Sequence, residues 1–286
     1  MEDKSGAISK RYTKLRTINK PVKAICLKIL EFIFKREKSL PVLCGPLFKK
    51  SLPKAVALNN PGMLLGRYEA EVLRELYAFA GSIKVAYDVG ANVGYVSLAL
   101  ADLVGEGGRV FSFEPEPENR ALMEQVISVN RAEKIIQIVP LAVGNSMCPQ
   151  KFIRWKASSM NLLEKAIDGQ DVSACESSIV QSTTLDAFIF ENNNPPPDLA
   201  KIDVEGAEVL VLEGGVKTIK RYSPPILIEV HGPNSAKKVW SFMRDIQYLW
   251  WHISGEGRLP ISSLEECLSL FSKESWTQHF LLTKSW

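Results

Sequence analysis

The chain has 286 residues, of which 46% are apolar and 23% charged, and its formal net charge is only +3. A globular protein of this length buries a large core without needing disulfides or metals as staples. The five cysteines are scattered with no CxxC pair, which argues against a disulfide framework and a cysteine zinc site and favours a reducing, cytoplasmic location.

The positive charge is concentrated near the N-terminus. Residues 1–56 hold fourteen Lys or Arg and four Asp or Glu, a net charge of +10, so the remaining residues carry −7. Residues 20–38 predict an amphipathic helix with lysines on its polar side. Such a helix could lie peripherally at the inner membrane surface, or it could pack on a protein surface. Packing on a protein surface is favoured, because surface helices with this pattern are common. The apolar run within it is too short and too charged to span a bilayer, and the first residues predict no secretory signal.

A Pro-containing connector follows over residues 39–64, so we expect an arm and linker over 1–63 and one domain over 64–286. Predicted helices cover residues 68–80, 94–103, 117–130, 185–190, 206–221 and 235–247. Predicted strands cover 84–89, 109–114, 135–143, 199–204 and 225–230, and residues 250–286 predict strands around a short helix at 263–271. Residues 145–182 are polar and irregular. Apolar strands that alternate with helices indicate a parallel sheet covered on both faces.

Acidic residues follow four of these strands, at the edge of the sheet where α/β proteins bind ligands. They are Asp88, within DVGANVG; Glu114 and Glu116, within FEPEP; Asp203 and Glu205, within KIDVEGAE; and Glu229, followed by His231, within IEVHG. Each carboxylate gathered at one edge raises the cost of ionising the next, so four such strand ends favour a functional explanation over four separate helix caps.

The glycine-rich turn favours one ligand class. Asn92 stands where a nicotinamide fingerprint has its middle glycine, and the chain has no GK[ST] for a P-loop. Glu114, 24 residues after Gly90, offers two carboxylate oxygens to the two hydroxyls of a ribose. Asp88 suits an ammonium group. A ribose with an ammonium describes S-adenosylmethionine better than NAD.

The motifs DVGANVG, FEPEP, LAVGN (141–145), TTLDAF (183–188), KIDVEGAE and IEVHG occur in an order that resembles the FkbM-type methyltransferases, over about residues 64–286. The resemblance implies an α/β, Rossmann-like class I methyltransferase fold, with a mostly parallel seven-stranded sheet, helices on both faces and an N-terminal helical arm in addition. It also implies O-methylation of a sugar, glycan or polyketide hydroxyl with S-adenosylmethionine. By this resemblance Asp88, Gly90, Ala91, Asn92 and Gly94 line the cofactor, Glu114 takes its ribose, and Leu141 and Ala142 lie by its adenine.

Asp203 is then expected beside the methyl group. A sugar hydroxyl is weakly acidic, so its proton needs a nearby base or a metal ion. Asp203, Glu205 or His231 is the candidate base. The alternative is a divalent ion such as magnesium held by Asp203 and Glu229, and the metal-independent route is favoured. Glu208 is interpreted as a solvated surface residue, and His252 and His279 receive no role.

Other interpretations stay open. Arg154 and Trp155, in the 146–182 insertion, could contact a sugar, or the insertion could be a surface excursion. A non-catalytic S-adenosylmethionine-binding protein or a membrane-associated interaction protein is the second functional hypothesis, and a NAD-dependent enzyme is the third. A nucleic-acid partner is not favoured, because the body of the chain is net negative.

Overall fold

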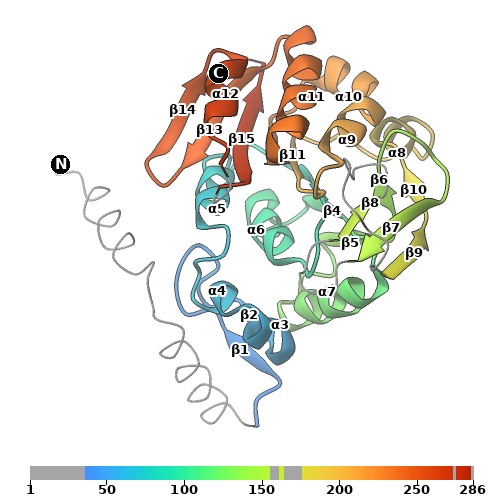
Figure 1. Cartoon of the computed structure of the whole chain (residues 1–286). Helices are drawn as coiled ribbons and strands as arrows, with labels where there is room; N and C mark the ends of the chain where they lie inside the picture. The colour runs from blue at the N-terminus through green and yellow to red at the C-terminus, as the bar shows by residue number, and fades with distance from the viewer. Residues whose placement is uncertain (1–35, 155–160, 164–175, 273–274, 285–286) are drawn as a thin grey trace.

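The structure is a computed structural model that describes residues 36–154, 161–163, 176–272 and 275–284 (Figure 1). The amphipathic helix predicted over residues 20–38 lies almost entirely outside these residues, so it stays a prediction. Within the described part of the chain, no helix has both the length and the apolar character needed to cross a membrane.

One eight-stranded sheet forms the centre of the molecule (Figure 1). Its strands, in spatial order, are β14 (Gly257–Ile261), β13 (Leu249–Ser254), β15 (Thr277–Thr283), β12 (Ile226–His231), β11 (Leu199–Ile202), β3 (Val85–Val89), β4 (Arg109–Phe113) and β5 (Ile136–Val139). The five strands from β12 to β5 are parallel, and β15 is antiparallel to both of its neighbours. The Rossmann-like α/β fold is therefore confirmed, and the number of seven strands is wrong, because β14 folds back as a hairpin on β13.

The order of the strands fixes where a ligand can bind. From β3 the chain moves outward through β4 to β5, and it then returns to the other side of β3 to form β11 and β12. The connections after β3 and β11 leave in opposite directions, which opens a crevice above the carboxyl ends of these two strands. The four acidic strand ends expected from the sequence all belong to this edge.

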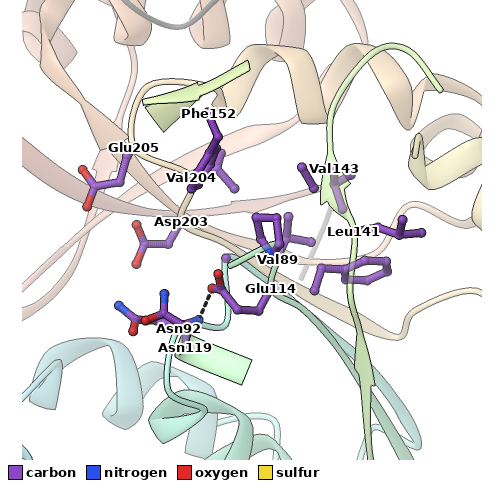
Figure 2. A pocket seen from close by; sticks show the side chains of 14 residues that line it. Val89, Asn92, Glu114, Asn119, Leu141, Val143, Phe152, Asp203, Val204 and Glu205 are labelled. Carbon is purple, nitrogen blue, oxygen red and sulfur yellow. Dashed lines mark hydrogen bonds between the residues drawn. The ribbon is translucent and has the colours of Figure 1, made fainter. Parts of the chain in front are cut away.

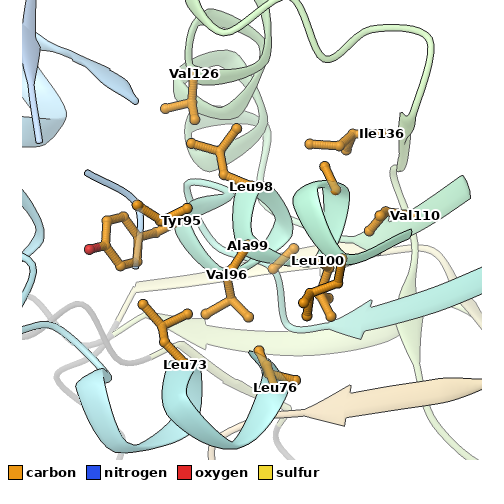
Figure 3. Packing of buried hydrophobic residues seen from close by; sticks show 14 of the residues in the cluster. Leu73, Leu76, Tyr95, Val96, Leu98, Ala99, Leu100, Val110, Val126 and Ile136 are labelled. Atoms are coloured by element: carbon orange, nitrogen blue, oxygen red, sulfur yellow. The ribbon is translucent and has the colours of Figure 1, made fainter. Parts of the chain in front are cut away.

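Helices cover both faces of the sheet, as predicted. On one face lie α5 (Ala70–Tyr77), α6 (Tyr95–Val104) and α7 (Pro117–Val129), whose apolar side chains pack with those of the strands (Figure 3). On the other face lie α8 (Leu185–Phe190), α9 (Glu208–Gly214), α10 (Val216–Tyr222) and α11 (Gly232–Asp245), and α12 (Leu264–Ser269) adds Cys267 to this second cluster. Strand side chains alternate between the two clusters: Val110 belongs to the first, and Phe111 belongs to the second.

The helix predicted over residues 206–221 is two helices, α9 and α10, which meet at Gly214 and Gly215. The first glycine packs directly on another part of the backbone. A Cβ atom at Gly214 would lie 1.9 Å from the carbonyl oxygen of Gly144, so no other residue fits there without movement. The close approach of two backbones explains a break that helical periodicity does not reveal.

The predicted connector is folded. It forms the hairpin strands β1 (Ser39–Pro41) and β2 (Ser51–Pro53) and the short helices α3 (Lys54–Asn59) and α4 (Pro61–Leu64). Leu40, Leu47 and Leu52 are buried in the same core cluster as α5 to α7. Residues 39–64 thus cover one face of the domain with their own apolar side chains.

The 146–182 insertion contains more structure than expected. Pro140, which lacks an N–H group, separates β5 from β6 (Ala142–Val143), and β6 pairs in parallel with β10 (Ser182–Thr183). Between them β7 (Gln150–Arg154), β8 (Asn161–Leu163) and β9 (Glu176–Val180) form a small antiparallel sheet. Trp155 and the side chain of Arg154 lie outside the described part, so their predicted role in sugar binding stays a prediction.

Candidate active site

The glycine-rich turn after β3 is built for close backbone contact. Gly90, Asn92 and Gly94 all have positive φ angles, of 83°, 50° and 82°. A Cβ atom at Gly90 would lie 1.8 Å from the carbonyl oxygen of Asp203, so only glycine lets this turn rest against the end of β11. The turn and the KIDVEG segment therefore meet at the crevice.

Glu114 is fixed at the end of β4 by two backbone donors. Asn92 N–H donates to its Oε2 at 2.8 Å (Figure 2), and Glu116 N–H donates to its Oε1 at 2.9 Å. The side chain is 4% exposed, and this burial raises the pKa of the carboxyl group, although the two N–H donors and the Asn119 side chain oppose the shift. The carboxylate also lines the pocket, so a ligand hydroxyl group that enters the pocket meets an acceptor held in a fixed position.

One pocket joins most of the residues expected to hold a cofactor (Figure 2). Its lining includes Gly90, Asn92, Glu114, Leu141, Ala142 and Asp203. Phe152 of β7 and Val204 add apolar surface that sequence reasoning had missed. Phe152 was missed because the insertion that contains it was expected to be irregular. Glu205 lines the end nearest Asp203.

Asp88, Ala91 and Gly94 are not among the pocket-lining residues. Asp88 is completely buried; Ser97 donates to its Oδ2 at 2.5 Å, and burial raises the pKa of its carboxyl group. Ala91 N–H donates to the Phe113 carbonyl at 3.0 Å, and Gly94 packs on Met123. These three residues hold the turn in shape beneath the pocket, and Asp88 faces the interior rather than a ligand ammonium.

A buried lysine balances the carboxylates at this edge. The Nζ atom of Lys201, on β11, lies 3.0 Å from Oδ2 of Asp203 and 3.9 Å from Oδ1 of Asp88. Burial alone would lower the pKa of its ammonium, but the surrounding carboxylates raise it well above its usual value. Lys201 is therefore a permanent internal cation directly below the rim of the pocket.

His231, at the end of β12, lies among four carboxylates. Its Nε2 is 3.1 Å from Glu205, 3.6 Å from Glu229 and 3.9 Å from Asp203. Burial acts to lower the pKa of the ring, but hydrogen bonds to Glu205 and Glu208 outweigh it and raise the pKa to about 11. In this arrangement the ring is an imidazolium at neutral pH, which does not favour His231 as a base that acts alone.

The prediction that Glu208 is a solvated surface residue is wrong. Its side chain is completely buried, at the first position of α9. It accepts hydrogen bonds from Gly206 N–H at 2.8 Å, from Ser235 Oγ at 2.5 Å and from His231 Nδ1 at 2.6 Å. Helical position alone did not reveal these partners, which come from α11 and from the end of β12.

The site also contains two residues that sequence reasoning missed. His279, on β15, lies opposite Glu229 on β12, and its Nε2 is 3.1 Å from Glu229 Oε2. The His279 hydrogen bond opposes the effect of burial, and the pKa of Glu229 is lowered to about 2. Glu69, at the N-cap of α5, places a carboxylate oxygen within 4.8 Å of oxygens of Asp203 and Glu229. Neither residue lies in a strand-end motif: Glu69 belongs to GRYEAEVLREL (66–76), which resembles the lead-in helix of the family, and strand register brings His279 to the site.

The comparisons with known proteins are consistent with the motifs and the pocket. The model of the family described as "Methyltransferase FkbM domain" matches residues 88–249, more than half of the chain. The chain belongs to the FkbM methyltransferase family. This confirms the resemblance found in the sequence. Glu69 and His279 lie outside the matched segment, one on each side of it.

Relatives of this FkbM-family chain are distant. The hexuronic acid methyltransferase AglP of Haloferax volcanii is 26% identical over 180 residues, which are 63% of this chain and 69% of AglP. The crystal structure of Methyltransferase FkbM from Methylobacillus flagellatus KT has a TM-score of 0.46 and 15% identity, covering 79% of this chain but only 53% of that one. An O-methyltransferase from Bacillus cereus in complex with SAH has a TM-score of 0.44 and 11% identity, covering 97% of both chains.

A divalent metal ion fits the rim poorly. Among the residues that the structure describes, two sets of side chains have ligand atoms within 4.8 Å of one another: Asp203, Glu205 and His231 form one, and Glu69, Asp203 and Glu229 form the other. However, Lys201 already faces Asp203 and His279 already faces Glu229. A magnesium ion coordinates carboxylate oxygens directly, and it would have to displace an ammonium and an imidazolium from them. We therefore derive no step through a metal ion.

Proposed function

We propose that this FkbM-family chain is an O-methyltransferase that transfers the methyl group of S-adenosylmethionine to a hydroxyl group of a sugar or a related small molecule. One observation carries the proposal. One pocket extends from Leu141 past Glu114 to Asp203 and Glu205 (Figure 2). The sites expected for an adenine, a ribose and a sulfonium therefore follow one another in the order in which the cofactor carries these groups.

The residues of the pocket suit each part of that cofactor. Leu141 and Phe152 offer apolar surface to a flat base, and the fixed carboxylate of Glu114 offers an acceptor to the ribose hydroxyls. Asp203 and Glu205 place negative charge where a sulfonium cation is expected. When it is bound, the cofactor supplies an electrophilic methyl group that already carries its leaving group.

The charge of the rim favours a neutral hydroxyl, rather than a carboxylate, as the group that accepts the methyl. Asp203, Glu205, Glu208 and Glu229 gather near His231, and the three cations Lys201, His231 and His279 balance only part of that charge. An acceptor carboxylate would be repelled there, whereas a hydroxyl would find partners for its proton. The relative named as a hexuronic acid methyltransferase supports a sugar acid as the acceptor. Within such a molecule, we propose a ring hydroxyl as the methylated group.

Calorimetric titration with S-adenosylmethionine, and separately with NAD, tests the cofactor. We expect binding of the first alone, with the same affinity in magnesium and in EDTA. Binding of NAD, or a requirement for magnesium, would contradict the proposal.

Methyl-labelled cofactor and a panel of hexuronic acids, neutral sugars and polyketide alcohols then test the acceptor. We expect a labelled product that survives mild alkaline treatment, because a methyl ether is stable to base and a methyl ester is not. A base-labile product would show carboxyl methylation instead.

A further inference from the structure

Glu69 occupies an unusual position at the edge of the proposed acceptor site. It is the residue before α5, and its backbone is left-handed, with φ 48° and ψ 35°. Glutamate rarely adopts this conformation, and residues held in it often mark functional sites because the surrounding structure must impose it. Here the turn directs the Glu69 carboxylate toward Asp203 and Glu229, and one oxygen of each lies within 4.8 Å of the others.

The partners of Glu69 differ from those of the other rim carboxylates. Asp203 faces Lys201 at 3.0 Å, Glu205 faces His231 at 3.1 Å, and Glu229 faces His279 at 3.1 Å. The Oε2 atom of Glu69 is buried and has no hydrogen-bond partner among the residues that the structure describes. An oxygen without a donor is unfavourable, and a hydroxyl group of an acceptor would supply the missing donor.

The position of Glu69 relative to the cofactor pocket supports this reading. Asp203 and Glu205 line the pocket, whereas Glu69 and Glu229 do not. An oxygen of Glu69 nevertheless lies within 4.8 Å of oxygens of Asp203 and Glu229. An acceptor hydroxyl placed beside Asp203 would therefore be close both to the methyl donor in the pocket and to Glu69.

We propose that Glu69 is the general base that removes the proton from the acceptor hydroxyl. The inference rests on the proposed function. In the step, the acceptor O–H bond breaks and its proton passes to the Glu69 carboxylate, while the hydroxyl oxygen forms a bond to the methyl carbon. The bond from that carbon to sulfur breaks, and its electron pair stays on sulfur. The positive charge of the sulfonium is thereby lost, the carboxylate becomes neutral, and no further reactant is needed.

The electrostatic surroundings of Glu69 match this role. Burial and the neighbouring carboxylates of Asp203 and Glu229 raise the pKa of Glu69 to about 7, although Lys201 on β11 and His279 on β15 act to lower it. The adjacent Tyr68 hydroxyl is a very weak acid, because burial and Glu69 raise the pKa of Tyr68. A base is most effective when its pKa lies near the working pH, and Glu229, with a pKa lowered to about 2, is a much poorer proton acceptor.

The test compares Glu69→Gln with Glu71→Gln, a matched variant two residues along the same segment. We expect Glu69→Gln to lower kcat by roughly 100- to 10,000-fold, the usual contribution of a general base, and to bind S-adenosylmethionine as the wild type does. In the wild type, kcat should rise with pH through a midpoint near 7, and this rise should be absent from the residual activity of Glu69→Gln. Glu69→Asp should retain part of the activity with the same pH dependence, and Glu71→Gln should leave kcat unchanged.

Carbon-13 NMR of the carboxyl groups in the free protein gives a readout that does not depend on turnover. The signal lost in the Glu69→Gln variant should titrate near pH 7. A titration near pH 4, or a fully active and folded Glu69→Gln variant, would overturn the role of Glu69 while leaving the methyltransferase function intact. A wild-type protein that binds the cofactor but methylates no acceptor would overturn both.

Discussion

The Nδ1 atom of His231 lies 2.6 Å from Oε1 of Glu208, a carboxylate that is completely buried. This contact fixes the orientation of the imidazole, because a ring held at Nδ1 must present its other nitrogen to the rim. Nε2 accordingly faces Glu205 at 3.1 Å. Glu208 thus influences the site indirectly, because it orients the ring of His231.

Replacement of Glu208 by Gln should destabilise the protein. Glutamine keeps the shape, but it removes the charge that His231 faces and puts an NH₂ group opposite existing donors. We expect a loss of about 1–3 kcal/mol in the free energy of unfolding, measured by urea denaturation. Glu213→Gln is the matched control, since Glu213 lies on the exposed side of the same helix. A loss of equal size in both variants would contradict the assigned role of Glu208.

The ring of His231 should stay protonated throughout the neutral range. Its pKa in the folded protein is raised to about 11, above the ordinary value of 6.5. This charge therefore contributes its full stabilisation below about pH 6.5, and the contribution is lost as the pH rises toward 11. Histidine NMR titration measures the midpoint directly, and Glu205→Gln should lower it. A wild-type midpoint near 6.5 would show that the surrounding carboxylates do not hold the proton.

Gly90 should tolerate no larger residue. Gly90→Ala puts a methyl group 1.8 Å from the Asp203 carbonyl oxygen, in addition to a φ angle of 83°. Gly81 has a similar φ of 79°, but a Cβ atom there meets nothing within 4 Å. We expect Gly81→Ala to cost about 1 kcal/mol from backbone conformation alone, and Gly90→Ala to cost about 3 kcal/mol or more. Equal shifts in thermal unfolding would show that the turn relaxes away from β11.

Glu114→Gln should weaken binding of S-adenosylmethionine while preserving the fold. The amide still accepts one backbone N–H, but it loses the charged acceptor proposed for the ribose. Hydrogen bonds to charged groups contribute about 1.5–3 kcal/mol, so we expect affinity to fall roughly 10- to 100-fold in calorimetry. Glu118→Gln, on the exposed first turn of α7, should bind like the wild type. Unchanged affinity in Glu114→Gln would place the ribose elsewhere.

Local sequence signals predicted the parts of the fold and site that depend on local physics. The helix over residues 185–190 has the predicted ends, because Thr184 caps it through its side chain. The DVGANVG and KIDVEG motifs also singled out four residues that line the pocket, since both motifs end parallel strands: Gly90, Asn92, Asp203 and Glu205. What these signals missed depends on contacts between distant segments: the split of α9 from α10 at Gly214, and the pairing of His279 with Glu229 across two antiparallel strands.

Asp88, the acidic residue of the glycine-rich motif, shows a related limit of prediction from local sequence. A residue at the end of a strand can point toward the ligand or toward the core, and local sequence does not distinguish the two at Asp88. The structure turns it inward, onto Ser97 and Lys201. A strand-end motif therefore does not ensure that its acidic residue faces the ligand, and Glu69, which lies outside these strand-end motifs, is nevertheless close to Asp203.

Lys201 has a consequence for how the site responds to its surroundings. Its ammonium is attached to a central strand and buried beneath Asp203, so the site is supplied with a counter-ion each time the chain folds. A dissociable ion would make charge balance at the rim depend on its concentration and on competing chelators. Here the counter-ion is encoded in the sequence as a single lysine, so every copy of the protein carries it whatever the ionic composition of its surroundings.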